Sequence, residues 1–328
     1  MSTNTKKAII LVNLGSPEQP TVSGVRAFLK PFLSDKRVVE VPKPIWWLIL
    51  NGVILPFRPK KVAQAYQSIW WQQGSPLRAI LQQQQEALQQ RFDSQQVRVL
   101  TAMTYGAPSV ESQIHALQQE GIEKIVILPL YPQYSATTTA AVTDQVCQML
   151  QRCRDIPDLR IVKSYYQHPG YIAALAESVS QYWQLHGKAE HLLMSFHGIP
   201  QANVDKGDPY YDHCLATAEA VADKLGLAVE DWTMSFQSRL GRAQWLTPYT
   251  ADTLQQYGPK KIKTLDVICP AFSADCLETL EEMAIENKEI YQQAGGGEYR
   301  YIAALNSESS HIDMMEDICQ RQLQSFID

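Results

Sequence analysis

A row of acidic side chains occupies the segment CPAFSADCLETLEEMAIE, residues 269–286. Its members are Asp275, Glu278, Glu282 and Glu286, and no basic residue stands among them. In an α-helix, side chains four positions apart lie on one face with about 40° of drift per step, so we expect one helix to carry the row. Like charges at this spacing destabilise an isolated helix by roughly a few tenths of a kcal/mol per pair. The row indicates either a path for cations or protons or an ordinary solvated surface, and the spacing does not separate the two.

One histidine stands at the end of a predicted strand. His197 lies in the segment SFHGIP, between an apolar run and a glycine. Carboxyl ends of parallel strands meet at one edge of a sheet, so we expect His197 to converge with Glu278, which begins the helix after a later strand. An imidazole that faces a carboxylate is either a proton acceptor or one of two ligands for a divalent metal ion. A lone histidine is also often structural, and two residues do not decide between these roles.

Aromatic and small polar residues stand at other predicted strand ends. Tyr131 and Ser135 lie in PLYPQYSATTT, Trp245 lies in QSRLGRAQWLTPYT, and Ser75 lies in GSPLR beside a turn. Aromatic rings provide wide apolar walls, which suit a flat and largely apolar ligand. We therefore expect such a ligand at the edge where these residues gather.

Strands and helical patterns alternate along the chain to position these side chains. Each of eight apolar runs ends in small or polar residues and precedes a helical pattern, which is typical of parallel sheets in an α/β fold. The runs occupy residues 6–17, 97–109, 123–135, 159–170, 191–200, 231–241, 262–276 and 299–309.

The two halves of the chain repeat part of this pattern in the same order. AIILVNLGSP (8–17) aligns with HLLMSFHGIP (191–200), and KIVILPLYPQYSATTTA (124–140) aligns with LDVICPAFSADCLETL (265–280). A repeat of this kind predicts two similar doubly wound, Rossmann-like domains with parallel sheets.

The length of 328 residues also favours two domains, since a single domain usually has roughly 100–200 residues. We expect a first domain over 1–160 and a second over 161–307, which carries His197 and Glu278. A C-terminal helix over 308–328 is expected to pack back on the first domain.

An insertion distinguishes the first half from the second. From Pro17 to Arg98 the first half runs 81 residues, whereas the second half runs 32 from Pro200 to Trp232. The excess of 49 residues predicts an insertion within residues 20–80.

The most apolar part of the insertion is VPKPIWWLILNGVILPFRPKK, residues 41–61. Asn51 and Gly52 interrupt it, and it falls short of the roughly 20 apolar residues that span a bilayer. An insertion after the first strand projects from the carboxyl edge of the sheet, where open α/β folds bind ligands. We expect a lip that receives a hydrophobic ligand or rests on a membrane surface; a plain core helix is the alternative.

The composition is that of an ordinary soluble globular protein. With 45% apolar residues, 19% charged residues and a net charge of −5, the chain has no basic footprint, so we expect no nucleic-acid partner. The N-terminal apolar run is too short for a signal-peptide core of roughly 7–15 residues, which predicts a cytoplasmic protein. Six scattered cysteines without a C-x-x-C pair predict neither a zinc ribbon nor a disulfide framework.

Several common catalytic motifs do not occur in the sequence. It has no G-x-G-x-x-G after its first strand, no G-x-x-x-x-G-K-[ST], no H-E-x-x-H and no G-x-S-x-G. These absences disfavour dinucleotide-binding, P-loop, zinc protease and serine hydrolase functions.

Seven separated segments together resemble the ferrochelatase family, whose members insert ferrous iron into protoporphyrin IX to make protoheme. The segments are LVNLGSP, QGSPL, LPLYPQYSATTT, SFHGIP, KGDPYYDHC, FQSRLGRAQWLTPYT and CPAFSADCLETLEE, in the order of the family. The resemblance covers nearly the whole chain. It implies two Rossmann-like domains with a porphyrin cleft between them. It also implies protoporphyrin IX and Fe²⁺ as substrates of a lyase, with no permanently bound cofactor.

The resemblance also implies roles for individual residues. His197 takes the place of the family's essential histidine and Glu278 that of its partner carboxylate, so this pair is expected to be catalytic and to bind the metal. Glu282, Glu286 and Asp275 are expected to form the path for metal or protons. The expected porphyrin contacts, including residues of the aromatic set above, are Asn13, Leu14, Arg58, Tyr66, Ser75, Tyr105, Tyr131, Ser135 and Trp245.

Two departures from the family pattern change the expectations. At Thr104 related enzymes often have arginine, so a contact of that arginine with the porphyrin rim or a propionate is expected to be absent. The chain ends at QSFID, without the cysteine-bearing extension that binds a [2Fe–2S] cluster in some members, so no cluster is predicted.

Three alternative functions stay open on the sequence. They are a coproporphyrin ferrochelatase, another tetrapyrrole chelatase such as a cobaltochelatase, and a porphyrin or heme carrier without chemistry. The apolar lip favours protoporphyrin, the less charged porphyrin, and adds the hypothesis of peripheral contact with the inner surface of a membrane. The sequence gives no indication of the oligomeric state.

Overall fold

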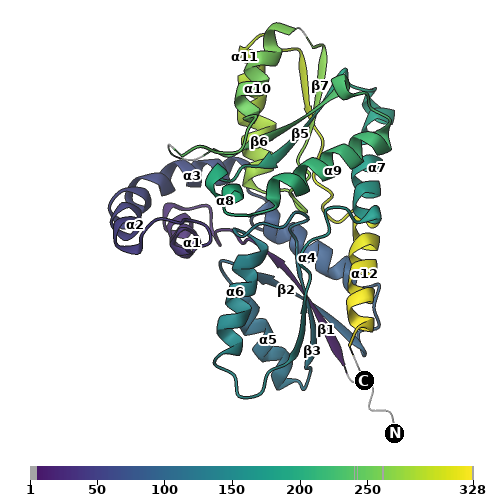
Figure 1. Cartoon of the computed structure of the whole chain (residues 1–328). Coiled ribbons are helices and arrows are strands. Elements are labelled where there is room, and N and C mark those ends of the chain that lie inside the picture. The colour runs from purple at the N-terminus through teal and green to yellow at the C-terminus, as the bar shows by residue number, and fades with distance from the viewer. Residues whose placement is uncertain (1–5, 240, 242, 261, 327–328) are drawn as a thin grey trace. The chain divides into compact units, whose positions relative to one another are not determined.

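A computed structural model describes residues 6–239, 241, 243–260 and 262–326 of the chain (Figure 1). The chain divides into two compact units. The first unit comprises Met1–Tyr131, Ala136–Ser164 and Ser307–Asp328, and the second comprises Pro132–Ser135 and Tyr165–Asn306.

The first unit is built on a sheet of four parallel strands. In spatial order the strands are β2 (Val97–Met103), β1 (Lys7–Asn13), β3 (Lys124–Pro129) and β4 (Asp158–Ile161). Apolar residues fill β1 and β3 on both faces, as expected of parallel strands that helices cover on both sides.

Eight helical segments belong to this unit. They are α1 (Val22–Ser34), α2 (Lys43–Ile49), the π-helical η1 (Leu50–Ile54), α3 (Leu55–Ile69), α4 (Pro76–Gln89), α5 (Val110–Gln119), α6 (Thr139–Leu150) and α12 (Ser309–Gln324).

The last helix of the chain, α12, packs within the first unit. It contacts α4 and β3. Arg91 forms an ion pair with Asp313 at 2.5 Å, and the Lys7 ammonium donates to the Leu323 carbonyl oxygen at 3.1 Å. These contacts attach the C-terminal segment to a sheet that lies far from it in sequence.

The second unit repeats the same sheet. Its strands are β6 (Trp232–Gln237), β5 (His191–His197), β7 (Thr264–Ile268) and β8 (Glu298–Tyr301), again all parallel and again with the first strand in second place. The helical segments are α7 (Pro169–His186), α8 (Gln201–Asp205), α9 (Tyr210–Leu225), η2 (Val229–Asp231), α10 (Thr250–Tyr257), η3 (Gly258–Lys260), the π-helical η4 (Glu278–Asn287) and α11 (Lys288–Gln293).

The identical strand order confirms the predicted pair of doubly wound Rossmann-like domains. Each of the eight predicted runs overlaps one of the eight strands in the described part of the chain, although β4 and β8 begin one residue before their runs. The aligned repeats place β5 on β1 and β7 on β3. In both sheets the order in which strands are added reverses between the two central strands, β1 and β3 or β5 and β7. Open α/β sheets bind ligands at such a point, at their carboxyl edge.

The insertion of the first unit consists of α1, α2, η1 and α3, which lie between β1 and β2 (Figure 1, purple to blue). Its apolar stretch is no plain core helix, because most of its large side chains face solvent. Exposed fractions of 55–74% occur for Ile45, Trp47, Leu48, Val53 and Phe57, and we call these five residues the apolar lip.

Parts of the same insertion do anchor it. Leu50 and Leu55 are buried, and the half-buried Trp46 donates its indole N–H to the Leu33 carbonyl oxygen at 2.5 Å. No helix in the described part of the chain combines the length and apolar character needed to cross a membrane.

Candidate active site

His197 is the last residue of β5 and its ring is half-buried. Its Nδ1 lies 2.7 Å from the carbonyl oxygen of Gly198. A carbonyl oxygen can only accept, so Nδ1 carries a proton and donates it in this contact. In the neutral ring, Nε2 then holds a lone pair that can accept a proton or bind a metal ion.

Gly198, which follows His197, packs closely against Gln237 and Trp245. A Cβ atom at this position would lie 2.8 Å from the Gln237 carbonyl oxygen and 3.3 Å from Cε3 of Trp245, so the backbone of β6 leaves no room for a side chain. The same approach lets the Gly198 N–H donate to the Gln237 oxygen at 2.8 Å. The glycine of SFHGIP therefore lets the predicted contact Trp245 pack against Gly198, the residue that follows His197.

Glu278 begins a π-helix, so the prediction of a regular α-helix is wrong in this respect. The ten residues Glu278–Asn287 form i→i+5 hydrogen bonds. Such segments are rare and occur often at functional sites. Each turn takes more than 3.6 residues, so Glu278 and Glu282 lie within one turn of each other.

Side chains from outside and inside the helix stabilise its wide turn. Gln237 donates to the Glu278 carbonyl oxygen at 2.7 Å, and Asn287 donates to that of Glu282 at 2.8 Å. Tyr299 donates to the Met283 carbonyl oxygen at 2.8 Å. These hydrogen bonds stabilise the π-helical conformation, which local helix propensity does not predict.

Glu282 is held by the end of β6. Its Oε1 accepts the Ser238 backbone N–H at 2.7 Å, and its Oε2 accepts the Ser238 hydroxyl and, at 3.3 Å, the Gln237 amide. Ser238 has φ of 66°, which is uncommon for a residue other than glycine. The backbone here adopts an unfavourable conformation that points two donors at one carboxylate.

The environment of Glu282 couples it electrostatically to its neighbours. Burial raises the pKa of Glu282, hydrogen bonds from Ser238 and the charge of His197 lower it, and the charge of Glu278 raises it. Although the residue as a whole is half-buried, protein donors surround its carboxylate. His197, Glu278 and Glu282 therefore form one electrostatic group.

The acidic row runs from this group to the surface. Glu278 and Glu282 are half-buried, whereas Glu286 is exposed. The last acid of the row is therefore the one that faces solvent.

Asp275 does not lie on the helix, contrary to the prediction of a single helix for the whole row. Its Oδ1 accepts hydroxyl protons from Thr279 at 2.9 Å and Tyr301 at 2.7 Å, and its Oδ2 accepts from the Asn306 amide at 2.8 Å. The side chain is buried. A carboxylate with these donors stabilises the turn between β7 and η4.

In the first unit, Asn13 and Leu14 follow directly on the apolar part of β1. The Asn13 side-chain oxygen accepts the Leu14 N–H at 2.8 Å, and the Tyr105 N–H donates to the Leu14 carbonyl oxygen at 2.8 Å. The Thr104 N–H donates to the Asn13 carbonyl oxygen at 2.8 Å. The ends of β1 and β2 are thus tied together at the carboxyl edge of the first sheet.

Two tyrosines stand at this edge. Tyr105 donates to the Asp35 carboxylate at 2.8 Å, and the Tyr131 hydroxyl lies 3.4 Å from that of Thr104. Burial, and for Tyr105 also Asp35, raises the pKa of both hydroxyls. Both tyrosines are therefore neutral at physiological pH.

The remaining predicted contacts of the first unit differ in exposure. Ser75 is buried, and its hydroxyl lies 2.5 Å from that of Ser16. Tyr66 is buried on α3, edge-on to Trp70 with ring centroids 6.0 Å apart. Arg58 is exposed on α3.

Ser135 belongs to the second unit. It is fully buried, and its hydroxyl donates to the Asp208 carboxylate at 2.9 Å. The neighbouring Tyr134 N–H donates to Nδ1 of His213 at 3.2 Å. These bonds fix the turn of the YPQYS segment against α9 and the residues that precede it.

The chain is similar to known ferrochelatases over nearly its whole length. A sequence model described as ferrochelatase matches residues 6–323. The chain belongs to the ferrochelatase family. A ferrochelatase of Acinetobacter baumannii (strain ACICU) is 51% identical over 322 residues, covering 97% of this chain and 95% of that protein. One of Aeromonas hydrophila is 50% identical, covering 97% and 99%. Metal insertion into a porphyrin, in heme biosynthesis, is thus the activity of this chain.

Solved structures of other proteins share this fold. SirB from Bacillus subtilis with Fe³⁺ has a TM-score of 0.57 at 12% identity, covering 97% of this chain and 96% of that one. CbiX, titled the terminal enzyme for biosynthesis of siroheme in denitrifying bacteria, has a TM-score of 0.52 at 12% identity, covering 98% and 100%. At this identity the likeness shows the fold alone, which agrees with the predicted chelatase-like architecture.

Two residues of this ferrochelatase site escaped the sequence prediction. Gln237 and Ser238 stand in the family segment FQSRLGRAQWLTPYT, but neither is ionisable, and only their placement opposite η4 shows what they bind. The signal available was the position itself, at the end of a strand that neighbours β5.

Cysteines near the site are not thiolates. Cys269 and Cys276 are buried and free, and burial is the largest cause that raises the pKa of both thiols. Among the residues that the structure describes, no group of three or more His, Cys, Asp or Glu side chains is arranged to hold a metal ion.

Proposed function

We propose that this chain inserts Fe²⁺ into protoporphyrin IX and releases two protons, giving protoheme. Membership of the ferrochelatase family supports the reaction class. The observation that carries the assignment of roles is the orientation of His197, whose Nδ1–H is used by the Gly198 carbonyl oxygen.

A free-base porphyrin presents two difficulties to a metal ion. Two of its four nitrogens carry protons, and the flat ring does not point their lone pairs at an incoming ion. Binding in a shaped site can supply a few kcal/mol, roughly 1–5, of the distortion that exposes them. The two protons then need an acceptor.

His197 is the proposed acceptor. With Nδ1–H donated to a carbonyl oxygen, its Nε2 lone pair can take a pyrrole proton. The resulting imidazolium is stabilised by the neighbouring carboxylate of Glu282, since the same interaction lowers the pKa of Glu282.

The acids of η4 are the proposed path. Glu278 stands at the start of the helix, Glu282 follows within one turn, and Glu286 reaches solvent. A carboxylate whose pKa is raised by burial takes up a proton more readily than an ordinary one, so Glu282 suits a relay. We propose a structural role for Asp275, which fixes the turn that precedes the helix.

The carboxyl edge of the first sheet is the proposed porphyrin contact of the first unit. Asn13 and Leu14 end its central strand, and the neutral hydroxyls of Tyr105 and Tyr131 suit an apolar macrocycle. Ser135 is buried, so we propose that it fixes the YPQYS turn rather than contacting the ligand.

The apolar lip supports protoporphyrin as the substrate and a membrane surface as the location of the protein. Protoporphyrin carries fewer carboxylates than coproporphyrin and partitions into membranes. Five exposed apolar side chains of the lip suit both a membrane surface and the less charged ligand. We therefore propose a cytoplasmic protein in peripheral contact with the inner surface of a membrane.

Anaerobic mixing of the protein with Fe²⁺ and a porphyrin, followed by absorption spectra, tests the function. Faster formation of the iron porphyrin from protoporphyrin than from coproporphyrin is expected. The reverse preference would favour a coproporphyrin ferrochelatase, insertion of cobalt alone would favour another chelatase, and binding without insertion would favour a carrier.

A further inference from the structure

Arg78 stands in the first turn of α4, three residues after the capping residue Ser75. It is half-buried. Its Nε and one terminal nitrogen, NH2, are shut off from solvent, and neither has a hydrogen-bond partner among the residues that the structure describes. A guanidinium is always charged and has five N–H donors, so leaving two of its nitrogens without acceptors is unfavourable.

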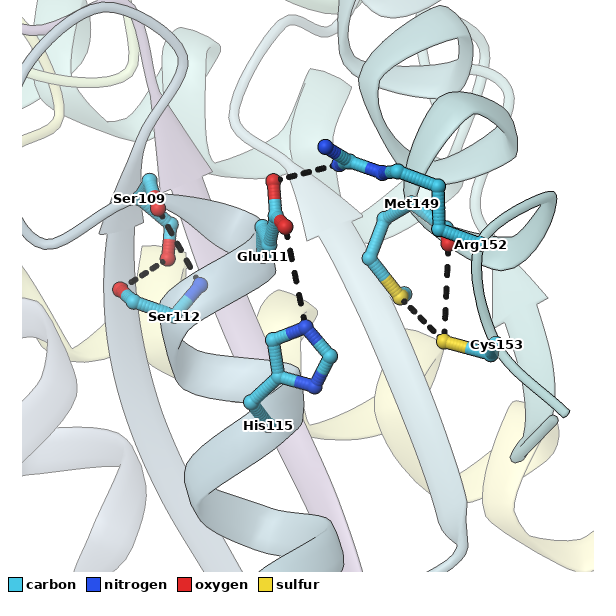
Figure 2. Close-up of polar contacts among 7 residues, drawn as sticks. All are labelled: Ser109, Glu111, Ser112, His115, Met149, Arg152 and Cys153. Atoms are coloured by element: carbon cyan, nitrogen blue, oxygen red, sulfur yellow. Dashed lines mark hydrogen bonds and ion pairs between the residues drawn. The ribbon is translucent and has the colours of Figure 1, made fainter. Parts of the chain in front are cut away.

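Other arginines of the first unit have acceptors. Figure 2 shows Arg152 donating to the Glu111 carboxylate, at 2.9 Å. Arg37 donates to Asp144 at 2.8 and 3.0 Å. Against these examples, the isolated charge of Arg78 indicates that its acceptor is supplied from outside the chain.

The position of Arg78 limits what that acceptor is. Its NH2 nitrogen lies 3.5 Å from where a Cβ of Gly106 would stand, and Gly106 has φ of 125°, a conformation that favours glycine. Gly106 follows Tyr105, which is tied to the end of β1 through Leu14. The guanidinium therefore lies at the carboxyl edge of the first sheet, where we placed the porphyrin.

Several polar groups around this edge are uncharged, although the Asp35 carboxylate that accepts from Tyr105 also lies there. Ser75 and Ser16 contribute paired hydroxyls, and Tyr105 is neutral. Thr104 carries no charge, and its hydroxyl donates to the Asn13 carbonyl oxygen at 3.2 Å. Arg78 thus supplies a positive charge that Thr104 does not.

We propose that Arg78 binds a propionate carboxylate of the porphyrin substrate. This inference rests on the proposed function, because the ligand is taken to be a dicarboxylic porphyrin. A guanidinium pairs with a carboxylate through charge-assisted hydrogen bonds in a fixed orientation. The pair would orient the macrocycle about its own plane while leaving proton transfer at His197 unaffected.

Porphyrin binding without metal, followed by fluorescence, tests the inference. The ligands are protoporphyrin and its dimethyl ester, which has the same ring but no carboxylate charge. For the dicarboxylate, Arg78→Met is expected to weaken binding by about tenfold or more, and Arg78→Lys by less. For the ester, wild type and Arg78→Met are expected to bind equally.

Arg152→Met is the matched control, because it removes the same charge from an exposed ion pair of the same unit. Its affinity for both ligands should equal that of wild type. Loss of affinity in Arg78→Met for the ester as large as for the dicarboxylate, or no loss for either, would overturn the proposal. If Arg78→Met does not fold, the same comparison of the two ligands with Arg78→Lys and Arg78→Gln decides.

The binding assay also separates this inference from the proposed function. It needs no iron, so a wild-type protein that binds protoporphyrin through Arg78 but inserts no metal would reject the enzyme and keep the carboxylate contact. In the active enzyme, Arg78→Met should raise the KM for porphyrin and leave kcat within about twofold of wild type. A fall in kcat at unchanged KM would overturn the proposed role.

Discussion

Ser238 donates both its backbone N–H and its hydroxyl to the carboxylate of Glu282, one to each oxygen. Hydrogen bonds to the ionised form lower the pKa of an acid, and here they oppose the larger effect of burial. Ser238 therefore acts as a positioning residue that keeps Glu282 in place and favours its ionised form.

Ser238→Ala removes the hydroxyl donor and keeps the backbone one. The pKa of Glu282 should rise further, so the acid limb of the pH profile of kcat/KM should move to higher pH. Ser112→Ala is the control, since the Ser112 hydroxyl donates to a helix-end carbonyl of Ser109 in the other unit. Identical profiles for wild type and Ser238→Ala would show that Glu282 does not limit the reaction.

Glu282→Gln tests the same carboxylate through stability. Burial raises its folded-state pKa above the ordinary value of 4.5, so its contribution to stability is fully present below that value and is lost as pH rises through the folded-state pKa. Glutamine does not titrate. The Tm of wild type minus that of Glu282→Gln should therefore decrease between about pH 4.5 and about pH 8. A constant difference across this range would contradict the raised pKa.

The strands and the repeat were predictable from the sequence, whereas the π-helix and the bonds to Glu282 were not. A local apolar run predicts a strand of a parallel sheet. The repeat of the β1 run in β5 predicts the same strand order in both sheets. The turn of η4 instead depends on donors such as Gln237 on β6 and Tyr299 on β8, which lie outside the helix. An argument from residue spacing assumes 3.6 residues per turn, so it does not predict a turn that depends on donors outside the helix.

Asp275 illustrates the same limit for a single side chain. Its spacing to the following acids fits a helix face, but Thr279, Tyr301 and Asn306 hold it in the preceding turn. The environment of Arg78 could not be predicted either, because the lack of a partner for two of its nitrogens among the described residues produces no sequence pattern.

His197→Ala removes the proposed proton acceptor. The rate of iron insertion should fall by at least about 100-fold, the lower range for general base catalysis, while porphyrin affinity changes little. Stopped-flow absorption measures the first and fluorescence the second. His115→Ala is the control, because it also removes an imidazole near a carboxylate. His115 is exposed on α5 of the first unit, and its Nε2 lies 3.7 Å from the Glu111 carboxylate. Insertion by His197→Ala within tenfold of wild type would remove the residue from its central role.

The apolar lip should decide membrane binding. Replacing Trp47, Leu48 and Phe57 together by serine should lower co-sedimentation with liposomes at least about tenfold, since each exposed apolar side chain gains up to about 1.5–3 kcal/mol on burial. Trp46 is left intact because its indole bonds to the Leu33 carbonyl oxygen within the fold.

Insertion into a detergent-solubilised porphyrin should stay near the wild-type rate in the same variant. Leu185→Ser is the control, because Leu185 is 80% exposed on α7 of the other unit. Equal sedimentation of the triple variant and the control would argue against a membrane role for the lip.

Tyr299→Phe should loosen the π-helix. Tyr299 donates to the Met283 carbonyl oxygen inside η4, whereas Tyr291 donates at 3.1 Å to the Ile262 carbonyl oxygen outside it. Each Phe variant loses one hydroxyl that bonds a backbone carbonyl, so both should lose about 1 kcal/mol of stability, measured by thermal unfolding. Only Tyr299→Phe should also lower kcat/KM for Fe²⁺, because only that bond helps to hold Glu282 and Glu278 within one turn. Equal effects of both variants on metal insertion would mean that the π geometry contributes stability alone.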